Sequence, residues 1–183
     1  MIRTHAIPDA FSPAECERLL AVVAEAPAND ARLVGRQTDH NQRRASLVWV
    51  EDLDEVDWVM DRIVTLVAEA NRTVFDFSLT EFAESAQVAS YDAGVGGHFD
   101  WHSDIGDGRL AGRRKLTMVV QLSDPASYEG GMLEIMPSGH VIAASTARGA
   151  AVLFPSYLLH RVTPITRGQR QSLTIWAHGP AFR

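Results

Sequence analysis

Two histidines and an aspartate in the C-terminal half of the chain have the types and spacing of a metal-binding set. His102 and Asp104 are two positions apart, so in an extended strand both side chains lie on the same face. His160 would join them from another strand. Two imidazoles and one carboxylate on one side of a metal ion leave the opposite coordination positions open, which indicates catalysis rather than structural support.

Arg170, ten positions after His160, adds a candidate anion clamp. Its guanidinium grips a carboxylate through two parallel hydrogen bonds and keeps its charge. A buried arginine needs an anionic partner, and this segment offers no acid, so we expect an external carboxylate; the alternative is a salt bridge to a distant Asp or Glu. In a regular strand Ser172 shares the face of Arg170 and would add a hydroxyl donor.

A second His-x-Asp pair, His98 and Asp100, makes the ligand assignment ambiguous. Strand parity puts both residues on the same face as His102 and Asp104, so spacing alone does not choose between the pairs. The alternative for His98 and Asp100 is a solvated or substrate-facing edge of the site. Taken alone, His160 could also be a hydrogen-bonded histidine of the core rather than a metal ligand. The remaining histidines are expected to be surface or structural residues: His5, His40, His140 and His178.

Four stretches carry a family resemblance, and they follow one another in order: Tyr91 to Gly94, Phe99 to Asp104, Glu129 to Glu134, and Phe154 to Trp176. Through them the chain resembles the iron(II)- and 2-oxoglutarate-dependent oxygenases, in particular the prolyl-4-hydroxylase-like branch. The resemblance favours His102 and Asp104 over the earlier pair, because aromatic residues precede the ligand histidine in this position.

The resemblance implies iron(II) held by His102, Asp104 and His160, with 2-oxoglutarate chelating the metal and Arg170 holding its other carboxylate. Dioxygen would be the second co-reactant. The reaction would hydroxylate an unactivated C–H bond and release succinate and CO2. Ascorbate is a candidate reductant. Tyr91 would donate its phenol to the cosubstrate, although the tyrosine-to-histidine interval is slightly longer than is typical.

Several functions remain open from the sequence. The substrate would be a peptidyl residue such as proline, or a free amino acid or other small metabolite. A non-catalytic metal-binding jelly roll, acting as a sensor or binding protein, is the alternative. A zinc hydrolase is a further one, although hydrolysis has no evident use for the carboxylate clamp at Arg170.

Composition fits one compact enzyme domain over residues 1–183, with 46% hydrophobic and 22% charged residues. A net charge of −6 argues against nucleic acid as a partner. The single Cys16 excludes an intramolecular disulfide. The N-terminus lacks the apolar core of a signal peptide, and no apolar run is long enough to span a bilayer, so we expect a cytoplasmic protein with no membrane partner. The sequence makes no prediction of the oligomeric state.

The elements that would position the site are predicted by periodicity and turn signals. Ser12 to Glu15 form a capping box that starts a helix reaching about Ala26, with Cys16 in its buried stripe. A second amphipathic helix covers residues 56–70. Short strand-like runs are expected at 46–50, 86–91, 116–122, 132–136, 150–154 and 172–177.

The predicted fold class is α+β, mainly β: a double-stranded β-helix, or cupin-like jelly roll, with N-terminal helices packed on one side. Residues 1–72 would form the helical support, including a candidate lid at 28–45, and residues 73–183 the jelly-roll catalytic core. Gly130 and Gly131 are expected to form a turn or bulge.

Two groups of basic residues are read as solvated faces, with attraction of an acidic substrate as the alternative. They are Arg113 to Lys115 near the metal strand, and Arg43 with Arg44 in the candidate lid.

Overall fold

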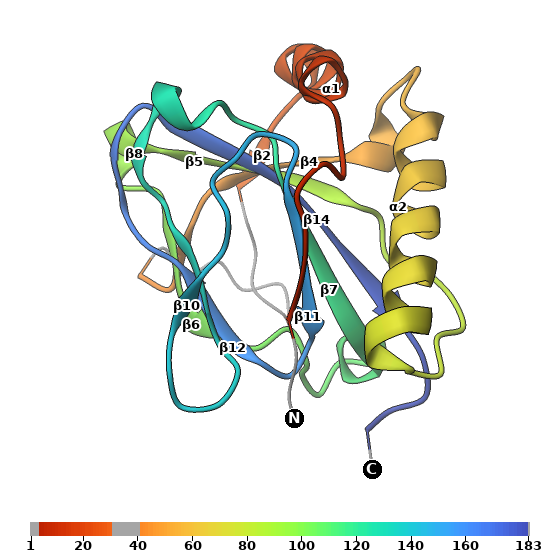
Figure 1. Ribbon diagram of the computed structural model, residues 1–183. Helices are drawn as coiled ribbons and strands as arrows, with labels where there is room; N and C mark the ends of the chain where they lie inside the picture. Colours follow the sequence, from red (N-terminus) through yellow and green to blue (C-terminus); the bar gives the residue numbers. More distant parts are fainter. Residues whose placement is uncertain (1–3, 31–40, 183) are drawn as a thin grey trace.

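The protein is a jelly roll: two facing antiparallel sheets, backed by two helices, as described for residues 4–30 and 41–182 in a computed structural model (Figure 1). The seven-stranded sheet has the order β1 (His5–Ile7), β11 (Ala151–Pro155), β7 (Arg114–Gln121), β14 (Gln169–His178), β5 (Gln87–Asp92), β4 (Ser46–Trp49) and β2 (Asn29–Asp30). The five-stranded sheet has the order β10 (Ile142–Ala143), β9 (Leu133–Met136), β12 (Leu159–Val162), β6 (His98–His102) and β3 (Arg43–Arg44). A two-stranded sheet pairs β13 (Ile165–Arg167) with β8 (Glu129–Gly130).

Helix α1 (Pro13–Glu25) begins with the predicted capping box. The Ser12 hydroxyl accepts a hydrogen bond from the Glu15 backbone N–H at 3.2 Å, and the Glu15 carboxylate accepts one from the Ser12 N–H at 2.7 Å. Both bonds satisfy donors that the first helical turn leaves free. Cys16 is fully buried on the apolar side of this helix, which confirms it as a core residue.

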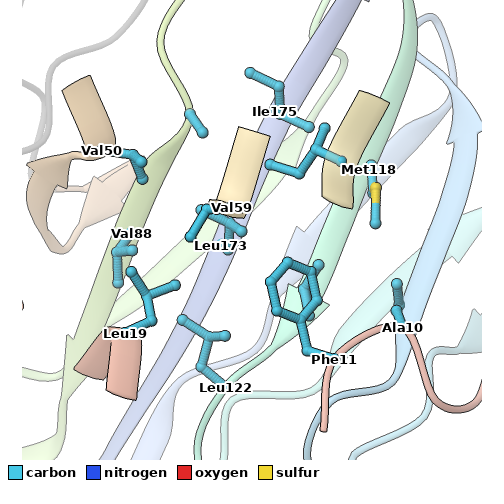
Figure 2. Close-up of a cluster of buried hydrophobic side chains, with 14 of the residues drawn as sticks. Ala10, Phe11, Leu19, Val50, Val59, Val88, Met118, Leu122, Leu173 and Ile175 are labelled. Atoms are coloured by element: carbon cyan, nitrogen blue, oxygen red, sulfur yellow. The ribbon is translucent and has the colours of Figure 1, made fainter. Parts of the chain in front are cut away.

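The outer face of the seven-stranded sheet packs against α1 and α2 (Asp57–Ala70). Figure 2 shows this core, in which Leu19 of α1 and Val59 of α2 lie over Val88 and Leu173 of the sheet. Burial of these side chains contributes roughly 1.5–3 kcal/mol each. The helices therefore fix the sheet that carries β7 and β14.

Strand alternation then decides what the inner face of this sheet presents. On β7, Met118 and Val120 belong to the core beneath the helices, whereas Thr117, Val119 and Gln121 point the other way. A second core fills the space between the two sheets. Its members include Phe154 on the seven-stranded sheet and Ile135 on the five-stranded sheet, both fully buried.

The N-terminal part supplies more than helical support, because β1, β2 and β4 all join the seven-stranded sheet. The turn or bulge expected at Gly130 and Gly131 corresponds to positive φ angles of 78° and 61° at the end of β8, whose pairing with β13 has a register irregularity. Most of the candidate lid lies outside the described residues; its two ends form β2 and β3. Within the described ranges, neither helix is long and apolar enough to cross a membrane.

Candidate metal centre

A cavity of about 1140 Å³ lies between the two sheets. Its walls come from β6 and β12 of the five-stranded sheet, from β5, β7 and β14 of the seven-stranded sheet, and from the segment that follows β6. A space of this size accommodates a small cosubstrate together with part of a substrate.

The three residues singled out by their spacing meet in this cavity. The Nε2 atoms of His102 and His160 lie 3.6 and 3.5 Å from the two carboxylate oxygens of Asp104. His160 and His102 are directly paired across β12 and β6, so the sheet register itself brings the two imidazoles together. One ligand atom from each residue lies within 4.8 Å of the others.

Both imidazoles are held in the tautomer that a metal needs. Nδ1 of His102 donates to the Asp100 carbonyl oxygen at 2.7 Å, and Nδ1 of His160 donates to the Leu158 carbonyl oxygen at 2.9 Å. These bonds leave the Nε2 atom of each imidazole on the side of Asp104. A hydrogen bond at the far nitrogen is the usual way in which proteins orient ligand histidines.

Asp104 is buried, and its surroundings favour the ionised form. Burial alone raises the pKa of this carboxyl, but His160, His102 and the Thr117 hydroxyl together hold the pKa well below its usual range. The Thr117 hydroxyl donates to one carboxylate oxygen at 2.7 Å. Burial also lowers the pKa of His160, although the Asp104 carboxylate acts in the opposite direction.

These residues fit a divalent metal ion. Ligand atoms about 2.0–2.2 Å from such an ion lie roughly 3 to 3.5 Å apart, close to the separations found between the imidazoles and the carboxylate. Two imidazoles and one carboxylate leave other coordination positions free toward the cavity, a set that suits a non-haem iron(II) ion.

Arg170 lines the same cavity and is 3% exposed. Its Nε donates to the Gln121 side-chain oxygen at 2.9 Å, whereas its Nη1 is buried without a hydrogen-bond partner among the described residues. Burial lowers the pKa of Arg170, and the phenols of Tyr91 and Tyr128 act in the opposite direction. A buried guanidinium nitrogen without an acceptor marks a place for an external carboxylate.

Tyr91 and Ser172 also line this cavity and are buried. Tyr91 faces Arg170 across β5 and β14, with the guanidinium carbon 5.8 Å from the phenol ring centroid. Arg170 and Ser172 share one face of β14 as expected, and Thr174 and Trp176 of the same strand also line the cavity.

The parity argument for His98 and Asp100 is wrong, because β6 contains a bulge. Between His102 and Phe99 this strand advances three residues while its partner β12 advances two, from His160 to Val162. Phe99 therefore faces the cavity and stacks on His102, with ring centroids 3.4 Å apart. His98 instead lies against the backbone carbonyls of Gly96 and Asn41.

The basic groups read as solvated faces are partly buried, so that reading is also wrong. Arg114 is 8% exposed, pairs with Glu84 at 2.5 Å and lies over the Trp176 ring. Arg43 is 7% exposed and lines the cavity. Of the other histidines that the structure describes, His178 is a buried structural residue bonded to Glu84, and His140 is exposed.

Two residues of the site were not identified from the sequence: Thr117, which supports Asp104, and Gln121, which supports Arg170. The signal was present in the apolar run of β7, where polar side chains recur with even spacing and so share the inner face. A polar residue inside a fully buried strand needs a partner.

A jelly roll with two imidazoles and one carboxylate at an open cavity is the architecture of a mononuclear metal site with free coordination positions. Comparison with known proteins gives the family: a family model described as the 2OG-Fe(II) oxygenase superfamily matches residues 86–178. A PKHD-type hydroxylase from Xanthomonas axonopodis pv. citri is 31% identical over 182 residues, which cover 93% of this chain and 76% of the relative. The chain belongs to the 2OG-Fe(II) oxygenase superfamily.

Other relatives match over shorter stretches. A PKHD-type hydroxylase from Teredinibacter turnerae is 48% identical over 64 residues, 35% of this chain and 28% of the relative. In this relative and in three others, from Sphingopyxis alaskensis and two strains of Pseudomonas putida, the matched part spans only 28% to 46% of the relative's length. A Pseudomonas putida prolyl-4-hydroxylase structure shares the fold, with a TM-score of 0.77 and 21% identity over 99% of this chain and 95% of that one.

Proposed function

We propose that this protein is an iron(II)- and 2-oxoglutarate-dependent dioxygenase that hydroxylates an unactivated C–H bond, with release of succinate and CO2. The observation that carries the proposal is the combination of two features in one cavity. One is the set of His102, Asp104 and His160, and the other is the buried, unpartnered Nη1 of Arg170.

Each residue has a task that follows from its surroundings. His102, Asp104 and His160 would hold iron(II), which supplies dioxygen activation when bound. Arg170 would bind the distal carboxylate of 2-oxoglutarate, with Gln121 fixing the guanidinium. Tyr91 and Ser172 would donate their hydroxyls to the same cosubstrate. The apolar walls exclude water, which protects the reaction from side paths.

The substrate is proposed to be a peptidyl residue, such as proline, or a free amino acid or other small metabolite. The relatives named PKHD-type hydroxylases support hydroxylation as the reaction class. One structure with the same fold, a prolyl hydroxylase from Trichoplax adhaerens, holds a peptide fragment of a hypoxia-inducible factor. That neighbour is 18% identical, with a TM-score of 0.78 over 96% of this chain and 83% of that chain. Its bound peptide is the reason for including a peptidyl residue among the proposed substrates.

The test is anaerobic addition of iron(II) and then 2-oxoglutarate, followed through the weak visible metal-to-ligand charge-transfer band. We expect the band in the wild type and its loss in His102→Ala. Arg170→Ala should retain iron but need on the order of 100-fold more 2-oxoglutarate, because a charged hydrogen-bonded partner is removed. His98→Ala is the matched control, since both ring nitrogens of His98 bond to backbone carbonyl oxygens, of Gly96 and Asn41.

Absence of the band in folded, iron-loaded wild type would contradict the proposal. A non-catalytic metal-binding jelly roll would then be favoured. Failure of the folded wild type to bind iron at all would instead favour a different metal.

A further inference from the structure

Arg43 is a buried cation in the wall of the metal cavity for which the described residues provide no anionic partner. Its side chain belongs to β3, the edge strand of the five-stranded sheet, and is 7% exposed. Its Nε is buried without a hydrogen-bond partner, and no ion pair joins it to an acid in the described part of the chain. Burying an unpaired charge is costly, so such a group marks a binding function.

The other charged groups lining the cavity already have a role. The Arg114 guanidinium is neutralised by Glu84 through two hydrogen bonds, of 2.5 and 2.6 Å. Asp104 belongs to the metal set, and Arg170 is assigned to the cosubstrate. Among the described residues of this wall, Arg43 remains as the cation without a counter-ion.

Arg43 is held close to the metal set by stacking. Its guanidinium carbon lies 4.6 Å from the ring centroid of Phe99, and the Phe99 ring stacks in turn on His102. The bulge in β6 creates this arrangement, because it turns Phe99 toward the cavity. A group bound at Arg43 therefore lies one aromatic ring away from a metal ligand.

We propose that Arg43 binds a carboxylate of the primary substrate and so places the reacting C–H bond beside the metal. This assignment rests on the proposed function, in which Arg170 binds 2-oxoglutarate. Arg43 is then available to bind a second anion. The guanidinium carbon lies over the Phe99 ring, the Nε is buried without a partner, and a guanidinium can pair with a planar carboxylate through two parallel hydrogen bonds. The carboxylate belongs either to a free acid, such as an amino acid, or to the C-terminus of a peptide.

Arg44 offers a matched control on the same strand. It follows Arg43 directly, so its side chain leaves the opposite face of β3, and it donates to the Val95 carbonyl oxygen at 2.9 Å. Arg43→Gln and Arg44→Gln remove the same charge from neighbouring positions. Only the first change removes a cation from the cavity.

Binding is measured by calorimetry under anaerobic conditions, with iron(II) and saturating 2-oxoglutarate so that Arg170 is occupied. The probes are matched pairs that differ in one charge: propionate and propionamide, N-acetyl-L-proline and its amide, and a proline-containing tripeptide with a free or amidated C-terminus. We expect the wild type and Arg44→Gln to bind at least one carboxylate about tenfold more tightly than its amide. Arg43→Gln should lose this preference, and the charge-transfer band should form with unchanged 2-oxoglutarate affinity.

The pairs separate the two sources of carboxylate. A preference confined to the tripeptide supports a peptide C-terminus, and one confined to the small acids supports a free acid. Equal binding of acid and amide by the wild type, or an unchanged preference in Arg43→Gln, overturns the assignment. If the band does not form at all, the proposed function has failed instead, so the two failures are distinct.

Thermal unfolding distinguishes a binding role from a structural one. Without probe, Arg43→Gln should keep or raise the melting temperature, because it removes a buried charge that lacks a partner. A lower melting temperature, not restored in Arg43→Lys, would show that Arg43 stabilises the fold and would overturn the proposal.

Discussion

At the scale of single residues, each ligand of the metal set is positioned by a second group. Backbone carbonyls orient the two imidazoles, and the Thr117 hydroxyl holds Asp104. The three residues could be predicted from residue type and spacing together with the family resemblance, which favoured His102 and Asp104 over the earlier His-x-Asp pair. Thr117 and Gln121 could not be assigned in the same way. No characteristic sequence interval relates a supporting residue to the residue that it supports, so it is recognised only by its contact in the structure.

Thr117→Val removes the hydrogen bond to Asp104 while keeping the shape of the side chain. We expect iron(II) affinity to fall about 10- to 100-fold, since the carboxylate loses the group that orients it. The affinity is measured by competition with a metal-sensitive dye.

Thr174→Val is the control for this change. Thr174 lines the same cavity, and no side-chain hydrogen bond to another described residue is found for it. Iron affinity equal to the wild type in both variants would show that Thr117 does not position the ligand.

At the scale of elements, the site depends on register irregularities that periodicity does not reveal. Both helices and six strands, β4, β5, β7, β9, β11 and β14, were predicted from the sequence within a few residues, since apolar periodicity and capping signals determine them locally. The bulge in β6 and the pairing of β3 with β6 were not. Both are set by neighbouring strands, and together they decide that Phe99 and Arg43 face the cavity.

Gly130, at the end of β8, has a backbone conformation that favours glycine. Its φ of 78° suits glycine, and a Cβ atom here would lie 2.2 Å from the Pro164 carbonyl oxygen. We expect Gly130→Ala to lower the free energy of unfolding by on the order of 3 kcal/mol, because the backbone must shift as well as adopt a strained φ. Urea titration measures this change.

Gly139→Ala separates the two contributions. Gly139 has a φ of 81°, but a Cβ atom there would meet no atom within 4 Å. Its cost should be about 1 kcal/mol, the strain alone. Equal losses in the two variants would mean that the close approach of Pro164 is relieved without cost.

At the scale of the whole molecule, Glu84 joins segments distant in the sequence. Its carboxylate accepts hydrogen bonds from Arg114 at the start of β7 and from His178 at the end of β14. Burial raises the pKa of Glu84, but these partners outweigh burial and lower the pKa to about 2 from 4.5.

The stability that Glu84 contributes should therefore depend on pH. With a lower pKa in the folded than in the unfolded protein, the contribution is complete above about pH 4.5 and is lost as the pH falls toward 2. The expected loss is on the order of 2 kcal/mol for the wild type relative to Glu84→Gln, in which this position does not titrate. Urea titrations of both proteins at pH 6, 4 and 3 measure it, and parallel pH dependences would contradict the prediction.

The three metal-set residues are fastened to different sheets. His102 and His160 lie on β6 and β12 of the five-stranded sheet, whereas Asp104 is bonded to Thr117 on the seven-stranded sheet. Phe154, also on the seven-stranded sheet, packs edge-on against the His160 ring at 4.8 Å between centroids. The distance between the two sheets therefore sets the separation of Asp104 from the two histidines. A change of side-chain volume at Phe154 would alter the ligand geometry without substituting a ligand. The two helices on the outer face of the seven-stranded sheet influence the metal site in the same indirect way, through the position of that sheet.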